Sequence, residues 1–432
     1  MYVLGITAEY NPFHNGHAYQ IQKAREQSGA DYVVVVMSPD FVQRGEPAVF
    51  DKFFRARCAL TCGADLVLEL PVVYATGSAE FFAEAAVRIL GNLGVVDSIS
   101  FGAETPDPSL LLAASQILSE EPLQFRSAMR KLLAEGSGFP AAREAAFLSC
   151  LQEGGPSDGV CADDAMRRRL IRAVEDGFFH SSNNILALEY CKAIQRTGHS
   201  FRILPVERKG SAYRDTRLPG HPDASEGIRH GTATDASTEF ASASAMREAM
   251  QRLEAEPSLA YCVPAEIRDL FSGMLPSAVF PDDFSSLTQL RLLEDGDLSR
   301  YADVSPDLAN RLDGMRYACQ GLSWEDMIDA VMTKQMTRTR VQRALLHLLL
   351  GITREQQAAL RSRDAFSCIR VLGFRKNASP LLHAIKKSGN ASLLTKVAAI
   401  SDLPDGINKE LLEKDIFASH LYRSISCKNS HT

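Results

Sequence analysis

The chain has 432 residues, which is too long for one ordinary hydrophobic core, so two or three domains are expected. Hydrophobic residues make up 45% of it and charged residues 23%, the balance of a globular protein rather than of a disordered chain. No apolar run approaches the length needed to cross a bilayer, and the N-terminus lacks the features of a secretory signal. The sequence therefore predicts a cytoplasmic protein that does not bind membranes.

Nine cysteines are scattered along the chain without a CxxC pair. This spacing is typical of free thiols in a reducing compartment, so neither a disulfide framework nor a metal site is expected. The formal net charge of −6 argues against a nucleic-acid partner unless the basic residues are segregated in one part of the chain.

The first candidate site is the stretch ITAEYNPFHNGH, residues 6–17. The uncharged run Tyr2–Thr7 predicts a buried strand, Asn11-Pro12 predicts a turn, and a helix is expected at Gly16–Gln27. A helix N-terminus after a strand and a tight turn forms an anion site, because free N–H groups and the positive end of the helix dipole point into the turn.

Two histidines, His14 and His17, stand three residues apart at this helix start and are expected on one side of it. Gly16 between them leaves room for a ligand to approach the backbone. Two imidazoles over an anion site suit the transition state of phosphoryl transfer. The spacing alone fits two polar surface histidines equally well, whereas a zinc pair lacks a third ligand nearby.

Strands and helices alternate over the first hundred residues. After the first strand and helix, strands are expected at Tyr32–Met37, Asp65–Leu70 and Asp97–Phe101, and helices at Asp51–Cys62 and Ser78–Leu93. The alternation predicts a parallel sheet covered on both faces, with ligands bound at the carboxyl ends of its strands. Five residues are expected along that edge: His14, Ser38, Gln43, Arg44 and Gly102. Two interpretations of Arg44 are open: its guanidinium group binds a phosphate or carboxylate through two hydrogen bonds, or it forms a surface ion pair.

Residues from about 106 to 180 are predicted to form a helical insertion, with helices at 110–118, 125–134 and 141–150 and a loop at 153–164. A further helix opens at Ser182-Asn183-Asn184, where Ser182 or Asn183 is the expected N-cap. One cap does not need two asparagines, so a ligand contact is an equal alternative. A strand is expected at Phe201–Val206, with Arg208 and the auxiliary Lys209 after it.

Residues 216–238 are predicted to form an exposed loop. The segment after it, ASASAMR, combines the hydroxyls of Ser242 and Ser244 with Arg247 one helical turn later. Hydroxyls and free N–H groups at a helix start can hold an anion, although an ordinary N-capped surface helix is the alternative.

Beyond residue 255 the pattern is helical, and residues 334–376 carry ten Lys or Arg against two acidic residues. This segregation is the pattern expected for a protein that binds a phosphate backbone, although a solvated helix face is the usual explanation of a charge run. The candidate RNA contacts are Arg338, Arg340, Arg343 and Arg370.

His14-Asn15-Gly16-His17 after a first strand resembles the HxGH signature of the nucleotidyltransferase superfamily, whose members attack the α-phosphate of ATP. With the segments FVQRGEPA (41–48), GFPAAR (138–143) and IRVLGF (369–374), the chain resembles the bacterial tRNA(Met) cytidine acetate ligases along nearly its whole length. Pro39-Asp40 stands where that family's pattern has Gly-Asn, so the resemblance does not predict the conformation of this loop.

The resemblance implies a Rossmann-like parallel α/β sheet. It assigns residues 1–255 to an ATP-binding nucleotidyltransferase-like catalytic domain, and residues 256–432 to a mostly helical, basic tRNA-binding domain. It implies ATP as a substrate, with Mg²⁺ between its phosphates, and acetate and elongator tRNA(Met) as the other partners, with no protein partner inferred. The implied reaction forms acetyl-adenylate and then N4-acetylcytidine at the wobble position.

The resemblance also implies catalytic roles for His14 and His17. The implied ATP-binding residues are Thr7, Ala8, Glu9, Tyr10, Asn11, Pro12, Phe13, His14, Asn15, Gly16, His17, Gly102, Asn183, Arg208, Ser242, Ser244 and Arg247. Two other functions remain open from the sequence: an adenylyltransferase of cofactor synthesis, and a non-catalytic RNA-binding protein with a regulatory nucleotide site.

Overall fold

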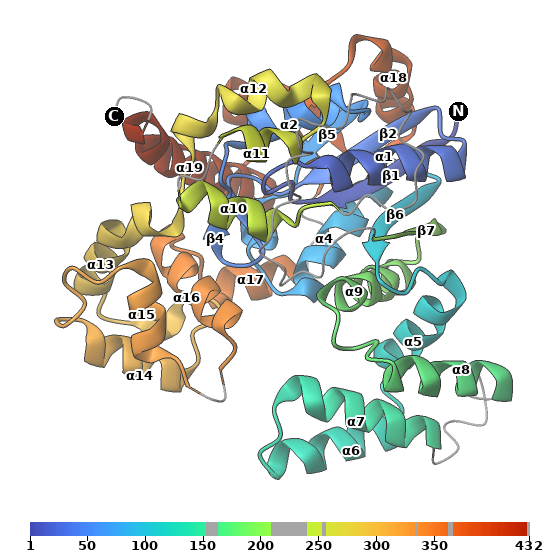
Figure 1. The fold of residues 1–432 in the computed structure, drawn as a ribbon, viewed down its shortest axis with the longest axis horizontal. Coiled ribbons are helices and arrows are strands. Elements are labelled where there is room, and N and C mark those ends of the chain that lie inside the picture. The colour runs from blue at the N-terminus through green and yellow to red at the C-terminus, as the bar shows by residue number, and fades with distance from the viewer. Residues whose placement is uncertain (153–162, 209–239, 253–255, 334–335, 362–365, 430–432) are drawn as a thin grey trace, which may run out of the picture.

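A computed structural model describes residues 1–152, 163–208, 240–252, 256–333, 336–361 and 366–429 (Figure 1). Within these ranges, seven strands form one sheet in the order β7–β6–β1–β2–β5–β8–β9. The first five pair in parallel, β8 runs antiparallel to β5, and β9 runs parallel to β8. The predicted α/β class with a mainly parallel sheet is therefore confirmed.

All five strands predicted between residues 2 and 206 occur, with ends within two residues of those expected. The strands of the sheet are Val3–Ala8 (β1), Tyr32–Met37 (β2), Leu66–Glu69 (β5), Ser98–Ala103 (β6), Arg202–Glu207 (β7), Cys368–Phe374 (β8) and Ser392–Leu394 (β9). A separate antiparallel hairpin joins Phe41–Val42 (β3) to Glu46–Pro47 (β4).

Helices cover both faces of the sheet. Since successive side chains of a strand point to opposite faces, neighbouring residues of one strand pack against different helices. Leu4 and Val33 pack with the side of α1 (Asn15–Ser28) and α2 (Lys52–Thr61). Their neighbours Val3 and Val34 pack with the side of α4 (Ala79–Asn92) and α9 (Ser182–Thr197). The nearly continuous apolar sequence of β1 and β2 follows from this burial on both faces.

The remaining helices form two lobes and a cover over the sheet, as the colours of Figure 1 show. One lobe contains α5 (Pro108–Glu120), α6 (Leu123–Ala134), α7 (Phe139–Gln152) and α8 (Asp164–Glu175). The other contains α13 (Ser285–Glu294), α14 (Pro306–Met315), α15 (Trp324–Val331) and α16 (Arg338–Leu350). The shorter and C-terminal helices are α3 (Val72–Ala75), α10 (Ala243–Gln251), α11 (Glu256–Tyr261), α12 (Arg268–Ser272), α17 (Arg354–Arg361), α18 (Ser379–Ser388) and α19 (Ile407–Asn429).

The C-terminal part of the chain adds two strands, β8 and β9, to the sheet that the N-terminal part forms. β8 pairs with β5, with Leu66 opposite Phe374, although this region was predicted to be mostly helical. The division of the chain near residue 255 stays a prediction, and the loop expected at 216–238 lies outside the described residues, as does most of the one at 153–164. None of the described helices is long and apolar enough to cross a membrane.

A buried cluster of charged residues links β8 and α19 to the N-terminal part of the sheet. Glu69 of β5 pairs with Lys52 of α2, and its other oxygen lies 3.2 Å from a guanidinium nitrogen of Arg370 on β8. Asp415 of α19 accepts the backbone N–H of Val72 at 2.6 Å, and burial raises the pKa of its carboxyl group. These charges are compensated inside the protein, which is the condition under which charged groups can be buried.

Candidate active site

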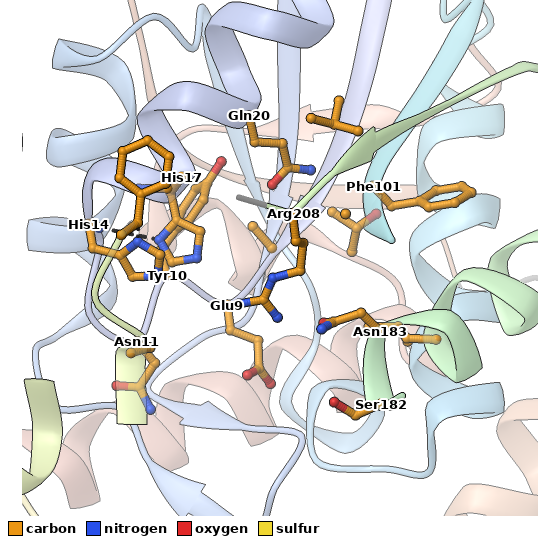
Figure 2. Close-up of a pocket in the computed structure, with 18 of the residues that line it drawn as sticks. Glu9, Tyr10, Asn11, His14, His17, Gln20, Phe101, Ser182, Asn183 and Arg208 are labelled. Atoms are coloured by element: carbon orange, nitrogen blue, oxygen red, sulfur yellow. Dashed lines mark hydrogen bonds between the residues drawn. The ribbon is translucent and has the colours of Figure 1, made fainter. Parts of the chain in front are cut away.

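A pocket opens at the carboxyl ends of β1, β6 and β7, between α1 on one face of the sheet and α9 on the other (Figure 2). This is the point where the connections from neighbouring parallel strands diverge, the usual ligand site of such sheets. Twelve of the predicted ATP-binding residues line it: Thr7, Ala8, Glu9, Tyr10, Asn11, His14, Gly16, His17, Gly102, Asn183, Arg208 and Arg247.

The other five predicted residues are not among those that line the pocket: Pro12, Phe13, Asn15, Ser242 and Ser244. The Asn15 side-chain amide donates to the Tyr261 carbonyl at 2.8 Å, which ties α1 to α11. The Ser242 hydroxyl caps α10 by accepting the N–H of Ala245 at 3.0 Å. An ATP contact by the five residues stays a prediction, whereas Asn15 and Ser242 have structural contacts of their own.

The two histidines face each other in a defined geometry. Their rings stack with centroids 3.7 Å apart. His14 is the N-cap of α1, and its Nδ1 accepts the N–H of Gly16 at 3.0 Å. Nδ1 of His17 accepts the N–H of His14 at 3.2 Å. Since each Nδ1 is an acceptor, the proton of each neutral ring is on Nε2, so both residues are hydrogen-bond donors through Nε2.

Both imidazoles are held neutral by their surroundings. Burial, with the positive charges of Arg208 and Arg247, lowers the pKa of His14 to about 3. Burial, His14 and Arg208 lower the pKa of His17 well below its ordinary value. Protonation in this site would bury a further positive charge beside existing ones, which is why the pKa values fall. The pair therefore offers two uncharged donors at neutral pH.

Gly16 has a second purpose besides the predicted ligand access. A Cβ at this position would lie 2.9 Å from Cε1 of His14, closer than side-chain atoms normally approach. Gly16 therefore makes room for the imidazole that caps its own helix. Gly102 is similar, since a Cβ there would come within 3.3 Å of the Arg208 side chain.

Three arginines reach the pocket from three different elements. Arg208 follows β7, Arg44 lies in the β3–β4 hairpin, and Arg247 lies on α10. Arg247 donates to the Asn11 carbonyl at 2.7 Å and pairs with Glu46 at 3.1 Å, which ties α10 to the hairpin. Three guanidinium groups beside two neutral donors and the N-terminus of α1 form a site suited to a polyphosphate.

The two asparagines at the start of α9 have different surroundings. Asn184 is buried, and its side chain accepts the N–H groups of Glu104 and Thr105 at 3.0 and 3.1 Å. Asn183 lies in the pocket wall, where its amide donates to Glu104 at 2.6 Å. The predicted N-cap was wrong by one residue, since Ser181 is the cap. Asn183 stays the predicted ATP contact of the two.

Sequence reasoning missed several pocket residues that helical spacing could have found. Leu186 and Tyr190 follow Asn183 at i+3 and i+7, so they lie on the same face of α9. Tyr19 and Gln20 follow Gly16 by three and four residues on α1. No local pattern signals Phe82, Phe101 or Phe240, which reach the pocket from other parts of the fold. Ser38, expected at the edge, is buried and does not line the pocket.

The loop with the unusual Pro39-Asp40 is held by buried contacts. Arg55 is fully buried and donates to the carbonyls of Glu9, Ser38, Pro39 and Phe50, which fixes the ends of β1 and β2 relative to each other. The Asp40 carboxylate accepts the N–H of Lys52 at 2.8 Å and the hydroxyl of Ser419 at 2.6 Å. Asp40 therefore joins this loop to the C-terminal helix α19.

The four predicted RNA contacts differ in accessibility. Arg338 and Arg340 are exposed near the start of α16, although Arg338 pairs with Asp329 at 2.7 Å. Arg343 pairs with Asp303 at 2.8 Å and its side chain is 14% exposed. Arg370 is buried against Glu69. Binding to RNA stays a prediction for all four, and Arg338 and Arg340 have the accessible side chains.

The β3–β4 hairpin connects the pocket to α16. Gln43 and Arg44 line the pocket, and the next residue, Gly45, has a φ of 81°. A Cβ on Gly45 would lie 2.4 Å from the backbone nitrogen of Arg343. The hairpin backbone can approach α16 this closely because residue 45 is a glycine. The hairpin end of the pocket therefore lies next to the basic helix.

A nucleotide-type pocket at this point of a parallel sheet, with the His14–His17 pair at a helix start, defines a nucleotidyltransferase of the HIGH type. A family model described as HIGH Nucleotidyl Transferase matches residues 1–432. Proteins named tRNA(Met) cytidine acetate ligase are 35% identical to this chain in Thermoanaerobacter sp. (strain X514) and in Acetivibrio thermocellus. The two matches cover 100% and 98% of this chain and 96% and 94% of those proteins.

Two crystal structures of Thermotoga maritima TmcAL have the same fold. The apo form I has a TM-score of 0.83 at 29% identity. Form II, bound with alpha-thio ATP, has a TM-score of 0.81 at 28% identity. Each match covers 98% of this chain and 95% of the other. The chain belongs to the tRNA(Met) cytidine acetate ligase family, a family of ligases.

Proposed function

We propose that this chain activates acetate with ATP and transfers the acetyl group to the wobble cytidine of elongator tRNA(Met), forming N4-acetylcytidine in the cytoplasm. The observation that carries the proposal is the pair of neutral histidine donors among three arginines at the N-terminus of α1. An acetate oxygen attacks the α-phosphate, pyrophosphate leaves, and the acetyl-adenylate then acylates the cytidine amine. The names of the relatives supply acetate, cytidine and tRNA(Met), and the family resemblance implies the elongator tRNA and the wobble position.

In the first step, charge builds up on the α-phosphate oxygens as acetate attacks. The Nε2–H groups of His14 and His17 are oriented before the reaction by their Nδ1 contacts, so they stabilise this charge without reorganisation. Arg247, fixed by Asn11 and Glu46, is the residue that we assign to the leaving pyrophosphate. Asn183 and Arg208, on the far wall, are assigned to the rest of the nucleotide.

A magnesium ion is expected with the triphosphate, but the part of the chain that the structure describes offers no site of its own for it. Among the described residues, no group of three or more His, Cys, Asp or Glu could hold a metal ion. Mg²⁺ prefers oxygen ligands and retains several waters, so phosphate oxygens and water suit it better than the histidines and arginines of this pocket. We therefore assign no residue to the ion and no step to it.

The test is ATP–pyrophosphate exchange that depends on acetate, followed by transfer of labelled acetate to tRNA(Met). Both activities are expected from the purified chain. An adenylyltransferase of cofactor synthesis would instead release a stable adenylated product and ignore tRNA. A regulatory RNA-binding protein would bind ATP and RNA without any exchange.

The exposed basic residues of α16 are assigned to tRNA binding. Replacing Arg338 and Arg340 together by alanine is expected to weaken tRNA binding and to reduce the slope of log K against log salt by up to about 2, because each phosphate contact contributes about 0.9. The measurement is a salt titration of tRNA binding. The matched control replaces Arg126 and Arg130, two exposed arginines of α6, and should leave the slope unchanged. An unchanged slope in the α16 variant would place the RNA elsewhere.

A further inference from the structure

Acetyl transfer to cytidine requires that a proton leave the amine. As the bond from N4 to the acetyl carbon forms, the bond from that carbon to the phosphate oxygen breaks, and its electron pair leaves with AMP. The nitrogen must give up one hydrogen as a proton, because it otherwise keeps a positive charge. The lone pair of this amine is delocalised into the ring, so a positioned base accelerates the attack.

The histidines cannot be that base. In each ring the Nδ1 lone pair accepts a backbone N–H, at 3.0 Å in His14 and 3.2 Å in His17. The remaining nitrogen, Nε2, already carries the proton of the neutral ring. Neither ring has a free lone pair, so the pair can donate hydrogen bonds but cannot take a proton while it keeps these contacts.

The described lining of the pocket contains two carboxyl groups, Glu9 and Glu207. Glu207 is the last residue of β7 and is exposed to solvent. Glu9 follows β1, is half-buried, and accepts the N–H of Gln43 on Oε1 at 2.8 Å. This bond fixes the carboxyl group, which reaches into the pocket in Figure 2. Of the two, Glu9 has the fixed orientation that a base needs.

Glu9 also lies on the side of the pocket from which RNA would arrive. Its partner Gln43 belongs to the β3–β4 hairpin, and Gly45 of that hairpin touches the backbone of α16 at Arg343. A nucleotide of an RNA bound along α16 would therefore enter past the hairpin. The carboxylate of Glu9, held by Gln43 of this hairpin, would then meet the incoming amine.

We propose that Glu9 is the general base of the transfer step, taking the N4 proton of the cytidine as the acetyl group moves from AMP to nitrogen. This inference rests on the proposed function and adds a catalytic residue to it. A carboxylate is an unsuitable ligand for the triphosphate itself, since both are negative, so a role for Glu9 in the transfer step is compatible with its place in this pocket.

The surroundings of Glu9 strengthen it as a base. Burial raises its pKa, so the carboxylate has a greater affinity for a proton than an exposed one. The charged or titratable groups that act on Glu9 or are affected by it come from the hairpin, α2, α9 and α10: Arg44, Glu46, Arg55, Tyr190 and Arg247. The Gln43 N–H, Arg44 and Arg247 oppose the effect of burial on this pKa, and Glu46 adds to it.

The test separates the two half-reactions in the Glu9→Gln variant, whose amide oxygen can still accept the Gln43 N–H. Single-turnover transfer from acetyl-adenylate to tRNA is expected to fall about 10²–10³-fold, the usual contribution of a general base. Acetate-dependent ATP–pyrophosphate exchange is measured at saturating ATP, because Glu9 is also a predicted ATP-binding residue, and it should fall less than the transfer step. In the wild type, transfer should decline as the pH drops through the raised pKa of Glu9, and this decline should be absent from the variant.

The matched control is Glu207→Gln, which removes the other carboxylate and should keep the wild-type ratio of transfer to exchange. A Glu9→Gln variant that keeps this ratio, or that loses both half-reactions in parallel, would overturn the role of Glu9 as the base. A wild-type protein without acetate-dependent exchange would instead contradict the proposed function itself. The two failures are therefore distinguishable.

Discussion

His14→Ala is expected to lower acetate-dependent ATP–pyrophosphate exchange by about 10²–10³-fold, the effect of removing one preorganised donor from a developing negative charge. The donor is Nε2–H of a neutral ring whose orientation is set by the Nδ1 contact to Gly16 at 3.0 Å and by stacking on His17. A mobile water can replace the hydrogen bond but not its orientation. Exchange rates at saturating ATP and acetate measure the loss.

The variant also removes the cap of α1, so its stability must be measured alongside its activity. Loss of an N-cap costs about 1 kcal/mol, which is too little to unfold a protein of ordinary stability. His14→Gln is the matched control, because an amide N–H is also a neutral donor, and it should recover part of the exchange activity. Binding of tRNA should be retained in both variants. A folded His14→Ala protein with wild-type exchange would contradict the role of this residue.

The features of the fold and site that depend on neighbouring residues could be predicted from the sequence, because short sequence patterns determine them. β1, the turn at Asn11-Pro12 and the start of α1 follow from an uncharged run, a proline and a capping position within the first 17 residues. The same holds for Arg247, one turn after a serine cap. Burial of β1 and β2 on both faces likewise appears directly as runs of apolar residues.

The features that the sequence could not predict depend on partners far along the chain. The sequence predicts residues 368–374 only as part of a basic, mostly helical region. No local signal in them indicates that β8 pairs with β5, about three hundred residues earlier. Nothing near Arg370 in the sequence separates it from the other predicted RNA contacts, because its partner, Glu69, lies on that distant strand. The neutrality of His14 and His17 depends in the same way on Arg208 and Arg247, which approach only in the folded protein.

A substitution in the buried cluster around Glu69 is expected to lower the stability of the protein rather than its catalytic rate. Glu69→Gln keeps the shape of the side chain but removes the negative charge between Lys52 and Arg370, both of which are buried. Asp40 remains 3.7 Å from Lys52. Burial and, second, the charge of Glu69 raise the pKa of Asp415, so the loss of Glu69 lets Asp415 compensate in part, but burial still opposes its ionisation. The strand β8 and helix α19 are thereby held less firmly on the sheet.

We expect Glu69→Gln to lower the free energy of unfolding by about 3–5 kcal/mol, the cost of removing one partner from a buried ion pair and leaving the other unpaired. Urea unfolding followed by circular dichroism measures it. The control is Asp405→Asn, which removes a carboxylate from an ion pair with Lys409 at 2.8 Å, where the Asp405 side chain is 95% exposed. A surface pair is worth less than about 1 kcal/mol, so this variant should unfold like the wild type. If Glu69→Gln also unfolded like the wild type, the ion pairs of this cluster would not be what holds β8 and α19 in place.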